Sequence, residues 1–175
     1  RIVAVARTID GGLCALYRVS SRAFPNRTAV IGQGQASIIP RPGHEADLRL
    51  NPYIAYNCAR LVCDGQVAVM SNGSHTDPVA EKIELGMPAR DAIAHALLAL
   101  DYEKDQYGTP RICAVVDKRG EGASWLGIVR DNGLEVRQAF LESGQFWYVA
   151  TYEEVHLCTQ PSGHFPAKTP EEACQ

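Results

Sequence analysis

The order of two hydrophobic patterns along the chain constrains its fold more than any other feature. Short alternating segments bounded by turn residues, which are typical of paired strands, occupy most of residues 2–71 and 111–153. Two segments with apolar residues at helical spacing lie between them. Strands and helices segregated in this way favour an α+β fold with largely antiparallel sheets over alternating β–α–β units. The 175 residues contain no repeat or linker and are expected to form a single domain, 1–175.

The strand segments are expected to pair as hairpins, because turn residues separate most of them. Asp64-Gly65 between two alternating runs is typical of a type I′ turn. A second hairpin, bent near residues 32–34, is predicted over 28–40, and residues 41–51 are expected to be irregular. The other predicted strands span residues 2–8, 13–21, 57–63, 66–71, 111–117, 124–130, 134–142 and 145–153.

Capping residues indicate the helix boundaries. Asp77 is expected to cap the first helix, with Pro78 at its first position and Gly86 after its end. The second helix is predicted over residues 89–103 from its apolar stripe. Thr169 is expected to cap a short helix near the end of the chain.

Arginine is concentrated at the beginning of the chain. Residues 1–44 contain six arginines and one acidic residue, a formal charge of +5, whereas the whole chain carries −3. The remaining 131 residues therefore carry −8. A mildly acidic protein is not a general nucleic-acid binder, which would carry a large basic excess. The local excess of arginine therefore needs a local explanation.

Several functional classes are excluded or disfavoured. No apolar run approaches the ~20 residues that a membrane-spanning helix needs. The six cysteines form no Cys-x-x-Cys pair, which favours reduced, mostly buried thiols in a cytoplasmic protein over a disulfide framework. The five histidines show no metal-ligand spacing, so no metal site is expected.

The first polar stretch with chemical potential spans residues 17–27. It holds Arg18, Arg22 and Arg27 together with serines and an asparagine, and it contains no acidic residue. Guanidinium groups beside hydroxyls and backbone amides are suited to a phosphate monoester. The alternative is a solvated basic loop.

A second stretch, residues 51–57, contains Tyr53 and Tyr56. These rings could stack on a base, or a phenol could transfer a proton. The alternative is an aromatic pair packed on the core at a strand edge.

A third stretch, residues 71–78, is polar and runs into the predicted helix start. Asn72, Ser74 and His75, with the backbone amides there, could bind an anion or the polar edge of a ring, and His75 could act as a general base. The alternative is an ordinary capped turn.

The fourth stretch follows the second predicted helix. Asp101, Glu103 and Asp105 lie near a helix C-terminus, where acidic side chains oppose the helix dipole. Residues that break a local preference are candidates for function. Glu103 and Lys104 could form an acid–base pair, and the alternative is a frayed, solvated helix end.

Four motifs together resemble the archaeal-type IMP cyclohydrolase family over residues 1 to about 155. They are Tyr-Arg-Val-Ser-Ser-Arg-x-Phe-Pro-Asn-Arg (17–27), Asn-Pro-Tyr-Ile-x-Tyr-Asn (51–57), Asn-Gly-Ser-His-Thr-Asp (72–77) and Asp-Tyr-Glu-Lys-Asp-x-Tyr-x-Thr-Pro-Arg-Ile (101–112). The resemblance implies an αββα sandwich of two mainly antiparallel sheets, similar to the N-terminal nucleophile hydrolases. This chain starts with Arg1 and offers no nucleophile before Thr8, so the resemblance implies that fold without amide hydrolysis.

The resemblance also implies a reaction, the closure of 5-formamidoimidazole-4-carboxamide ribonucleotide to inosine monophosphate (IMP) with loss of water. This chemistry needs a phosphate anchor, a group that assists loss of the amide proton and a donor to the formyl oxygen. It requires no metal or other cofactor. The implied partners are a purine ribonucleotide substrate and IMP, with no nucleic acid and no membrane, and exposed sheet edges are compatible with a homo-oligomer.

Roles for individual residues follow from the resemblance as hypotheses. Arg22 and Arg27 would hold the phosphate or polarise the formyl oxygen, Tyr56 would donate a proton, and Glu103 would orient or deprotonate the carboxamide with Lys104 close by. The remaining polar residues would assist at the phosphate or line the ring and ribose: Ser21, Asn26, Asn57, Asn72, Ser74 and His75.

Three arginines have no assigned role and are expected on the surface: Arg1, Arg7 and Arg41. Three alternatives remain open at this point. The chain could be a noncatalytic purine-nucleotide-binding protein, an amide hydrolase exposed by processing, or a structural protein.

Overall fold

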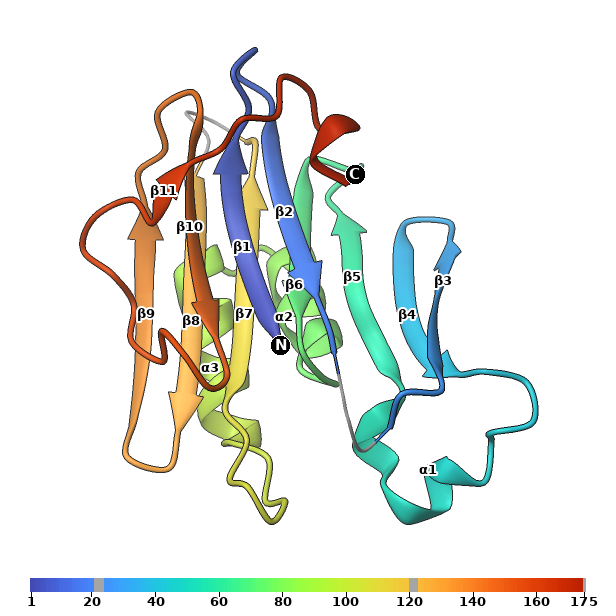
Figure 1. Ribbon diagram of the computed structural model, residues 1–175. Helices are drawn as coiled ribbons and strands as arrows, with labels where there is room; N and C mark the ends of the chain where they lie inside the picture. The colour runs from blue at the N-terminus through green and yellow to red at the C-terminus, as the bar shows by residue number, and fades with distance from the viewer. Residues whose placement is uncertain (21–23, 120–122, 175) are drawn as a thin grey trace.

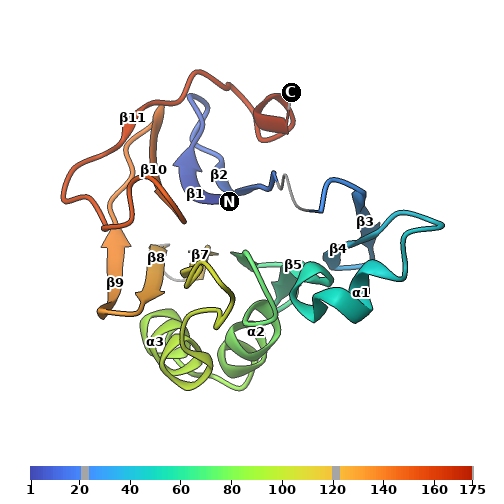
Figure 2. The ribbon, with the colours of Figure 1, turned by 60° about the horizontal axis from the view of Figure 1, so that its bottom comes forward.

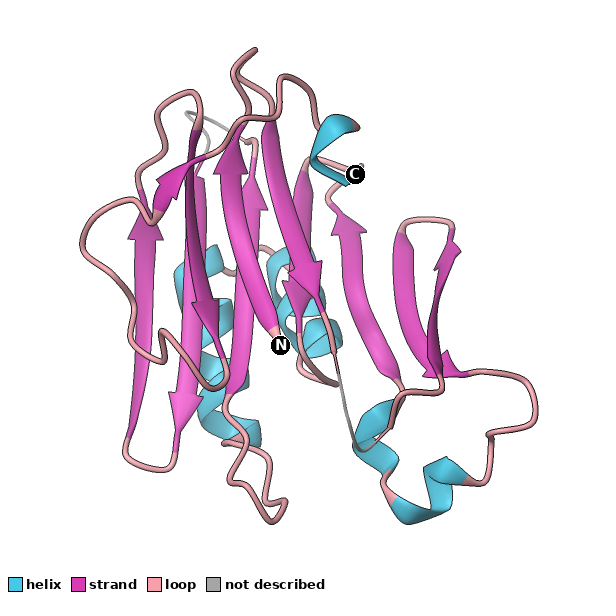
Figure 3. Cartoon of the chain, in the orientation of Figure 1, coloured by secondary structure: helices cyan, strands magenta, loops and turns pink. Residues whose placement is uncertain are grey.

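A computed structural model of the chain describes residues 1–20, 24–119 and 123–174 (Figures 1 and 3). The large sheet contains β3 (Arg27–Gly32), β4 (Gln35–Pro40), β5 (Tyr56–Val62), β6 (Val67–Ser71), β7 (Arg111–Asp117), β8 (Ala123–Arg130) and β9 (Gly133–Ala139), hydrogen-bonded in that order. The small sheet has the order β11 (Gly163–His164), β10 (Gln145–Ala150), β1 (Ile2–Arg7) and β2 (Leu13–Arg18). The helical elements are α1 (Asp47–Leu50), η1 (Pro52–Ile54), α2 (Thr76–Glu84), α3 (Ala89–Leu100) and η2 (Glu172–Cys174).

Both sheets are antiparallel throughout. The large sheet follows chain order as a meander from β3 to β9, whereas the small sheet brings β1 between β2 and β10. The pairing of Ile2 with Ala150 therefore places the start of β1 beside the end of β10. The prediction of an α+β fold with two mainly antiparallel sheets is confirmed.

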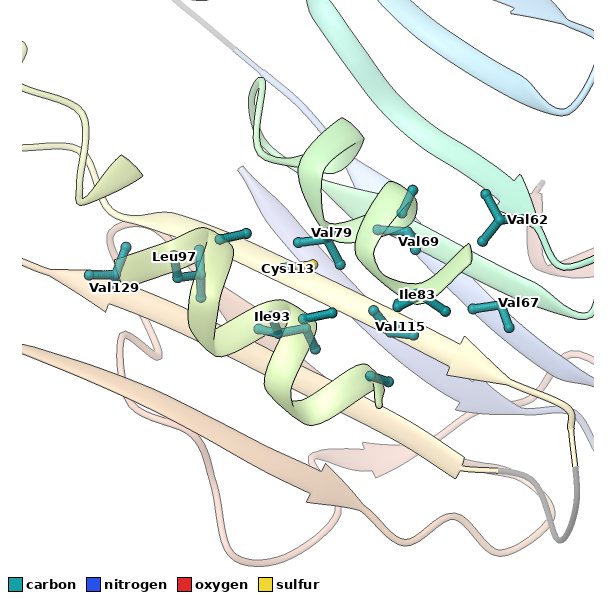
Figure 4. Close-up of a cluster of buried hydrophobic side chains, with 14 residues drawn as sticks. Val62, Val67, Val69, Val79, Ile83, Ile93, Leu97, Cys113, Val115 and Val129 are labelled. Atoms are coloured by element: carbon teal, nitrogen blue, oxygen red, sulfur yellow. The ribbon is translucent and has the colours of Figure 1, made fainter. Parts of the chain in front are cut away.

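The elements stack as layers around the large sheet. Helices α2 and α3 cover one face, and the small sheet covers the other (Figure 2). On the helix side, Ile83 and Leu97 pack with Val69 and Val115 of the sheet (Figure 4). Strand β7 serves both cores, because alternate residues point to opposite faces of a strand.

The second helical layer of the expected αββα arrangement has no counterpart in the part of the chain that the structure describes. No α-helix lies over the outer face of the small sheet within that part. Where Thr169 was expected to cap a helix, its hydroxyl accepts a hydrogen bond from the Glu172 amide at 3.4 Å, and only the short turn η2 follows. The described residues thus form three layers.

Several element boundaries differ from the predictions because distant contacts override local capping. Helix α2 begins at Thr76, and Asp77 binds the Asn57 side chain instead of capping the helix. Helix α3 ends at Leu100 because Asp101 adopts a left-handed conformation, with φ of 56°. Segment 41–51, which was predicted to be irregular, contains the single turn α1.

Three strands end earlier than predicted. Strand β2 ends at Arg18, and β10 ends at Ala150, where the chain turns and the Ala150 amide donates to the Glu154 carbonyl. Strand β9 ends at Ala139, ahead of a turn closed by a hydrogen bond from the Gln145 amide to the Glu142 carbonyl.

The predicted type I′ turn is confirmed. Asp64 and Gly65 both have positive φ, and the Gln66 amide donates to the Cys63 carbonyl at 3.1 Å. Cys58 and Cys113 are buried thiols, as expected. Among the described helices, none has the length and apolar character that a bilayer crossing needs.

Gly127 allows α3 to pack closely against β8, which gives a test of the helix layer. A Cβ atom at this position would collide with Ile93 Cγ2 and lie 3.0 Å from Leu97 Cδ1. We expect Gly127→Ala to lower the free energy of unfolding by about 1–3 kcal/mol through overpacking. Urea denaturation measures this change. Gly133→Ala is the control, since its Cβ would find only ordinary contact at 3.6 Å; equal stability of the two variants would contradict the packing.

Candidate functional site

The candidate site lies at one end of the sandwich, where β2 ends and β1, β5 and β7 begin (Figure 1). Each of the four polar stretches contributes a residue to this end: Tyr17, Tyr56, His75 and Glu103. The guanidinium group of Arg1 connects them, because it contacts Glu103 and lies within electrostatic range of both tyrosines.

Glu103 is the central acidic residue of the site. Its side chain is 1% exposed, and its Oε2 atom accepts a hydrogen bond from Arg1 Nη1 at 2.9 Å. Arg111 Nη1 lies 3.9 Å from the other carboxylate oxygen, Oε1. Burial raises the pKa of Glu103, and the two guanidinium groups oppose this rise.

The loop after α3 turns Glu103 inward. The Glu103 amide donates to the Thr109 carbonyl at 2.8 Å, and Arg111 Nε donates to the Asp101 carbonyl at 2.8 Å. Asp105 holds the loop, because its carboxylate accepts from the amides of Tyr107 and Thr109 and from the Thr109 hydroxyl. The acidic residues near the C-terminus of α3 are therefore held in a hydrogen-bonded loop, and they do not belong to a frayed helix end.

Lys104 does not pair with Glu103, and this correction follows from the loop geometry. Its ammonium group is 2.5 Å from Asp101 Oδ2 and 3.5 Å from the centre of the Tyr102 ring. The side chain is exposed, whereas that of Glu103 is buried. Neighbouring residues in this loop thus point in opposite directions.

Three polar atoms that make no hydrogen bond within the described residues converge above Gly73. They are Glu103 Oε1, Arg111 Nη1 and His75 Nδ1, and all three are buried. A Cβ atom on Gly73 would lie 2.9 Å from Arg111 Nη1, 3.4 Å from His75 Nδ1 and 3.5 Å from Glu103 Oε1. The lack of a side chain at position 73 therefore keeps these atoms around one small space.

His75 is a neutral ring that donates its one hydrogen bond to the backbone. Its Nε2 lies 2.9 Å from the Ile112 carbonyl oxygen, and because a carbonyl only accepts, Nε2 is assigned the proton and Nδ1 the lone pair. Burial lowers the pKa of His75 to about 3. At neutral pH this ring is a weak base, which argues against the hypothesis that His75 acts as a general base.

Tyr56 shares a hydrogen bond with Tyr17, a residue that sequence reasoning did not select. The two hydroxyl oxygens lie 2.6 Å apart. Burial raises the pKa of Tyr56, while the Tyr17 hydroxyl and the nearby Arg1 and Arg27 oppose the rise. The pKa of Tyr17 is raised by burial and by Tyr56. Either hydroxyl can donate in this pair, and when Tyr17 donates, the Tyr56 hydrogen is left for another acceptor.

Arg27 lies beside an open cavity of about 320 Å³. Its Nε donates to the Phe24 carbonyl at 3.2 Å, and its Nη1 donates to the Ile54 carbonyl at 3.4 Å. The cavity is lined by Val19, Ser20, Phe24, Pro25, Arg27, Thr28, Ala29 and Ile38. Ile38 and Val19 also pack against the tyrosine pair, so the cavity adjoins it. The predicted phosphate residues Ser21 and Arg22 lie outside the described residues.

The residues predicted to line the ring and ribose are not brought together. Asn57 points to the helix face of the sheet, opposite to Tyr56, and there binds Asp77 and Ser37. Asn72 is buried and joins two strands through the Pro110 carbonyl and the Ile112 amide. Ser74 is exposed, and His75 is the member of this set that lies near Glu103. Asn26, which was predicted to assist at the phosphate, is half-buried.

Arg1 and Arg7 correct the expectation that three arginines lie on the surface. The Arg1 side chain is 16% exposed and binds Glu103, and Arg7 is half-buried between the sheets. Arg41 is exposed, as expected. Arg111 was also missed, although it lies within stretch 101–112; its position directly before a fully apolar strand was the available signal.

The described residues contain no group of three or more His, Cys, Asp or Glu side chains that could hold a metal ion. The site consists of guanidinium groups, phenols, one carboxylate and one neutral imidazole. Such a set binds anions and donates hydrogen bonds to developing negative charge.

Comparisons with known proteins agree on one family. The family model described as "IMP cyclohydrolase-like protein" matches residues 1–175. The IMP cyclohydrolase of Methanococcus aeolicus is 41% identical over 176 residues, which cover all of this chain and 84% of that protein. Those of Methanosphaera stadtmanae and Methanocella arvoryzae are 47% and 49% identical, covering 87% and 88% of this chain and 72% and 73% of their own lengths.

The buried neutral state of His75 predicts a specific loss of stability in acid. The unfolded chain protonates this histidine near pKa 6.5, whereas the folded chain holds the pKa at about 3. The unfolded state thus binds more protons between these values, and the stability that is present above pH 6.5 falls as the pH is lowered. Urea denaturation at several pH values measures this effect. Between pH 3 and 6.5, the free energy of unfolding of the unmodified protein should fall more steeply with decreasing pH than that of His75→Gln, by up to about 1.4 kcal/mol per pH unit. The control is the exposed His156→Gln, and equal slopes in all three proteins would disprove burial of a neutral His75.

Proposed function

Because the chain belongs to the IMP cyclohydrolase family, we propose that it closes 5-formamidoimidazole-4-carboxamide ribonucleotide to IMP with loss of water. The observation that carries this proposal is the buried Arg1–Glu103–Arg111 cluster beside the Tyr56–Tyr17 hydroxyl pair. Both groups lie at the same end of the sandwich, and each of the four family motifs places a residue there.

The charge of the site suits a nucleotide. Arg1 and Arg111 face one buried carboxylate, Glu103, and Arg27 lies within electrostatic range of Tyr56, which leaves an excess of positive charge among these groups. A phosphate monoester carries about −1.5 to −2 at neutral pH. We place the phosphate at the cavity beside Arg27, and the base at the tyrosine pair and Arg1.

The ring closure joins the carboxamide nitrogen to the formyl carbon. The carboxamide nitrogen loses a proton and the formyl oxygen gains one, which gives a hydroxyl group on the new ring carbon. That hydroxyl group then leaves as water after a second protonation, while the former formamide nitrogen loses its proton and forms the C=N bond of the ring. Tyr56 is the proposed donor to that oxygen, with Tyr17 donating to Tyr56 as its charge develops. One such donor contributes about 3 kcal/mol to the transition state.

Glu103 is proposed to orient the reacting amide. Its Oε2 binds Arg1, so Oε1 is the oxygen left to accept from the carboxamide N–H. An intramolecular attack depends strongly on holding the two groups in a reactive geometry. Lys104 faces Asp101 and is proposed at most to order the loop.

Substitution of the two central groups tests the proposal. Tyr56→Phe and Glu103→Gln should each lower kcat by at least about 100-fold, because one removes the proton donor and the other the amide acceptor. The assay follows the inosine chromophore during turnover of the formylated substrate. Tyr152→Phe and Glu153→Gln, both exposed, are matched controls. Normal turnover in both site variants would refute the assignment, and absence of turnover in the unmodified protein would favour a noncatalytic nucleotide-binding protein.

Gly73→Ala tests the convergence of polar atoms above this residue. The added Cβ would lie within 2.9 Å of Arg111 Nη1 and should displace that group and Glu103 Oε1. We expect kcat to fall by at least about tenfold, since small misplacements have large effects on oriented reactions. The melting temperature should change little, because a side-chain end can move. Gly32→Ala, with its nearest contact at 3.6 Å, is the control; unchanged turnover in Gly73→Ala would argue against this geometry.

A further inference from the structure

A second cavity lies between the sheets at the end opposite to the candidate site. Its volume is about 480 Å³, within the range of small-molecule sites. Arg7 at the end of β1 and Trp147 of β10 line it from the small sheet, and Ser124 of β8 and Ala139 of β9 from the large sheet. Strand β1 places Arg1 and Arg7 about 20 Å apart, at roughly 3.3 Å per residue. The cavity is therefore separate from the site around Glu103.

The strand register directs Arg7 and Trp147 to the same space. Val5 pairs with Trp147, Arg7 pairs with Gln145, and both Val5 and Trp147 pack into the core between the sheets. Since side chains alternate along a strand, Arg7 points to the same face as Val5. Arg7 and Trp147 are thus diagonal neighbours, within reach of long side chains.

Both residues hold a buried donor that has no partner. Arg7 Nε and Trp147 Nε1 are inaccessible to solvent and make no hydrogen bond within the described residues, and the Trp147 side chain is almost fully buried, at 5% exposure. Arg7 makes no ion pair in the described part of the chain. Buried donors are normally paired, and an unpaired one is unfavourable. Two such donors beside one cavity indicate a ligand that supplies acceptors.

The polar lining of this cavity provides few acceptors of its own. Glu142 is its one described acidic residue, and its carboxylate accepts from the Gln145 side chain at 3.2 Å instead of binding Arg7. Apart from the indole, the other polar side chains of the lining are neutral amides and hydroxyls, which can donate as well as accept. Ser124 and Gln138 add a hydroxyl and a carboxamide beside the guanidinium and indole donors. A positive group with surrounding neutral donors is typical of an oxyanion site.

We propose that the Arg7–Trp147 cavity is a second binding site that takes the oxyanion of a small phosphorylated molecule. Arg7 supplies the positive charge, the Trp147 indole N–H supplies a directed donor, and the apolar walls accommodate the carbon part of the ligand. This proposal is independent of the reaction at Glu103, since the cavity shares no residue with that site.

Tryptophan fluorescence gives a local test. The chain has two tryptophans, so Trp125→Phe leaves Trp147 as the single reporter, and this variant is the reference protein. Ribose 5-phosphate and inorganic phosphate are titrated separately. A saturable change in emission with ribose 5-phosphate is expected, and a weaker one with inorganic phosphate shows that the anion alone is recognised.

Substitutions in this background identify the residue responsible. Arg7→Gln should weaken binding by at least about tenfold, because it removes the charge and keeps a polar side chain. Arg41→Gln, at an exposed arginine, and Arg27→Gln, at the other cavity, should leave the midpoint unchanged. Turnover of the formylated substrate should remain normal in Arg7→Gln.

Three outcomes would overturn the proposal. They are no saturable change below about 10 mM ligand, an unchanged midpoint in a folded Arg7→Gln protein, or loss of the signal in Arg27→Gln. Far-ultraviolet circular dichroism checks that each variant is folded. If Arg7→Gln does not fold, Ser124→Ala and Gln138→Ala replace it, and unchanged binding in both would likewise refute the site.

Discussion

A carboxylate that is removed from water needs positive charge or hydrogen-bond donors around it, and this requirement organises one end of the molecule. Glu103 meets it with Arg1, which directly precedes β1 of the small sheet, and Arg111, the first residue of β7 in the large sheet. The charged cluster therefore joins the two sheets at the point where their shared apolar core ends. The same contacts that close the sandwich hold the candidate catalytic groups in place.

Periodicity predicted the elements better than it predicted their ends. Strand β7 spans Arg111–Asp117, as expected, because its residues are apolar on both faces and one core lies on each side. Boundaries moved where a side chain found a distant partner. Asp77 has the right chemistry for a cap, but the Asn57 carboxamide on the neighbouring strand takes its carboxylate. Such competition depends on which strands are neighbours, and local sequence does not contain that information.

The sequence indicated which stretches form the candidate site more reliably than it indicated which residues of each stretch face it. Each polar stretch contributes one residue, yet Asn57 and Lys104 point away from their neighbours Tyr56 and Glu103. Alternation along β5 explains the first case, whereas the loop at 101–110 has no period from which the second could be derived. Arg1 lies 102 positions from its partner Glu103, and only the topology of the two sheets brings them together.

Strand β1 pairs with β2 on one side and β10 on the other; Arg1 directly precedes it, and Arg7 is its last residue. Both ends of the sandwich thus depend on one six-residue segment. If β1 slipped by one residue against its neighbours, every side chain of the strand would turn to the opposite face of the sheet. The positions of Arg1 and Arg7 would then be lost together. The amide hydrogens of Val3 and Val5 lie on a strand that is paired on both sides, so their exchange with solvent requires β1 to open from a neighbouring strand. Local fluctuation at one end of the molecule is therefore felt at the other through the pairing of a single strand.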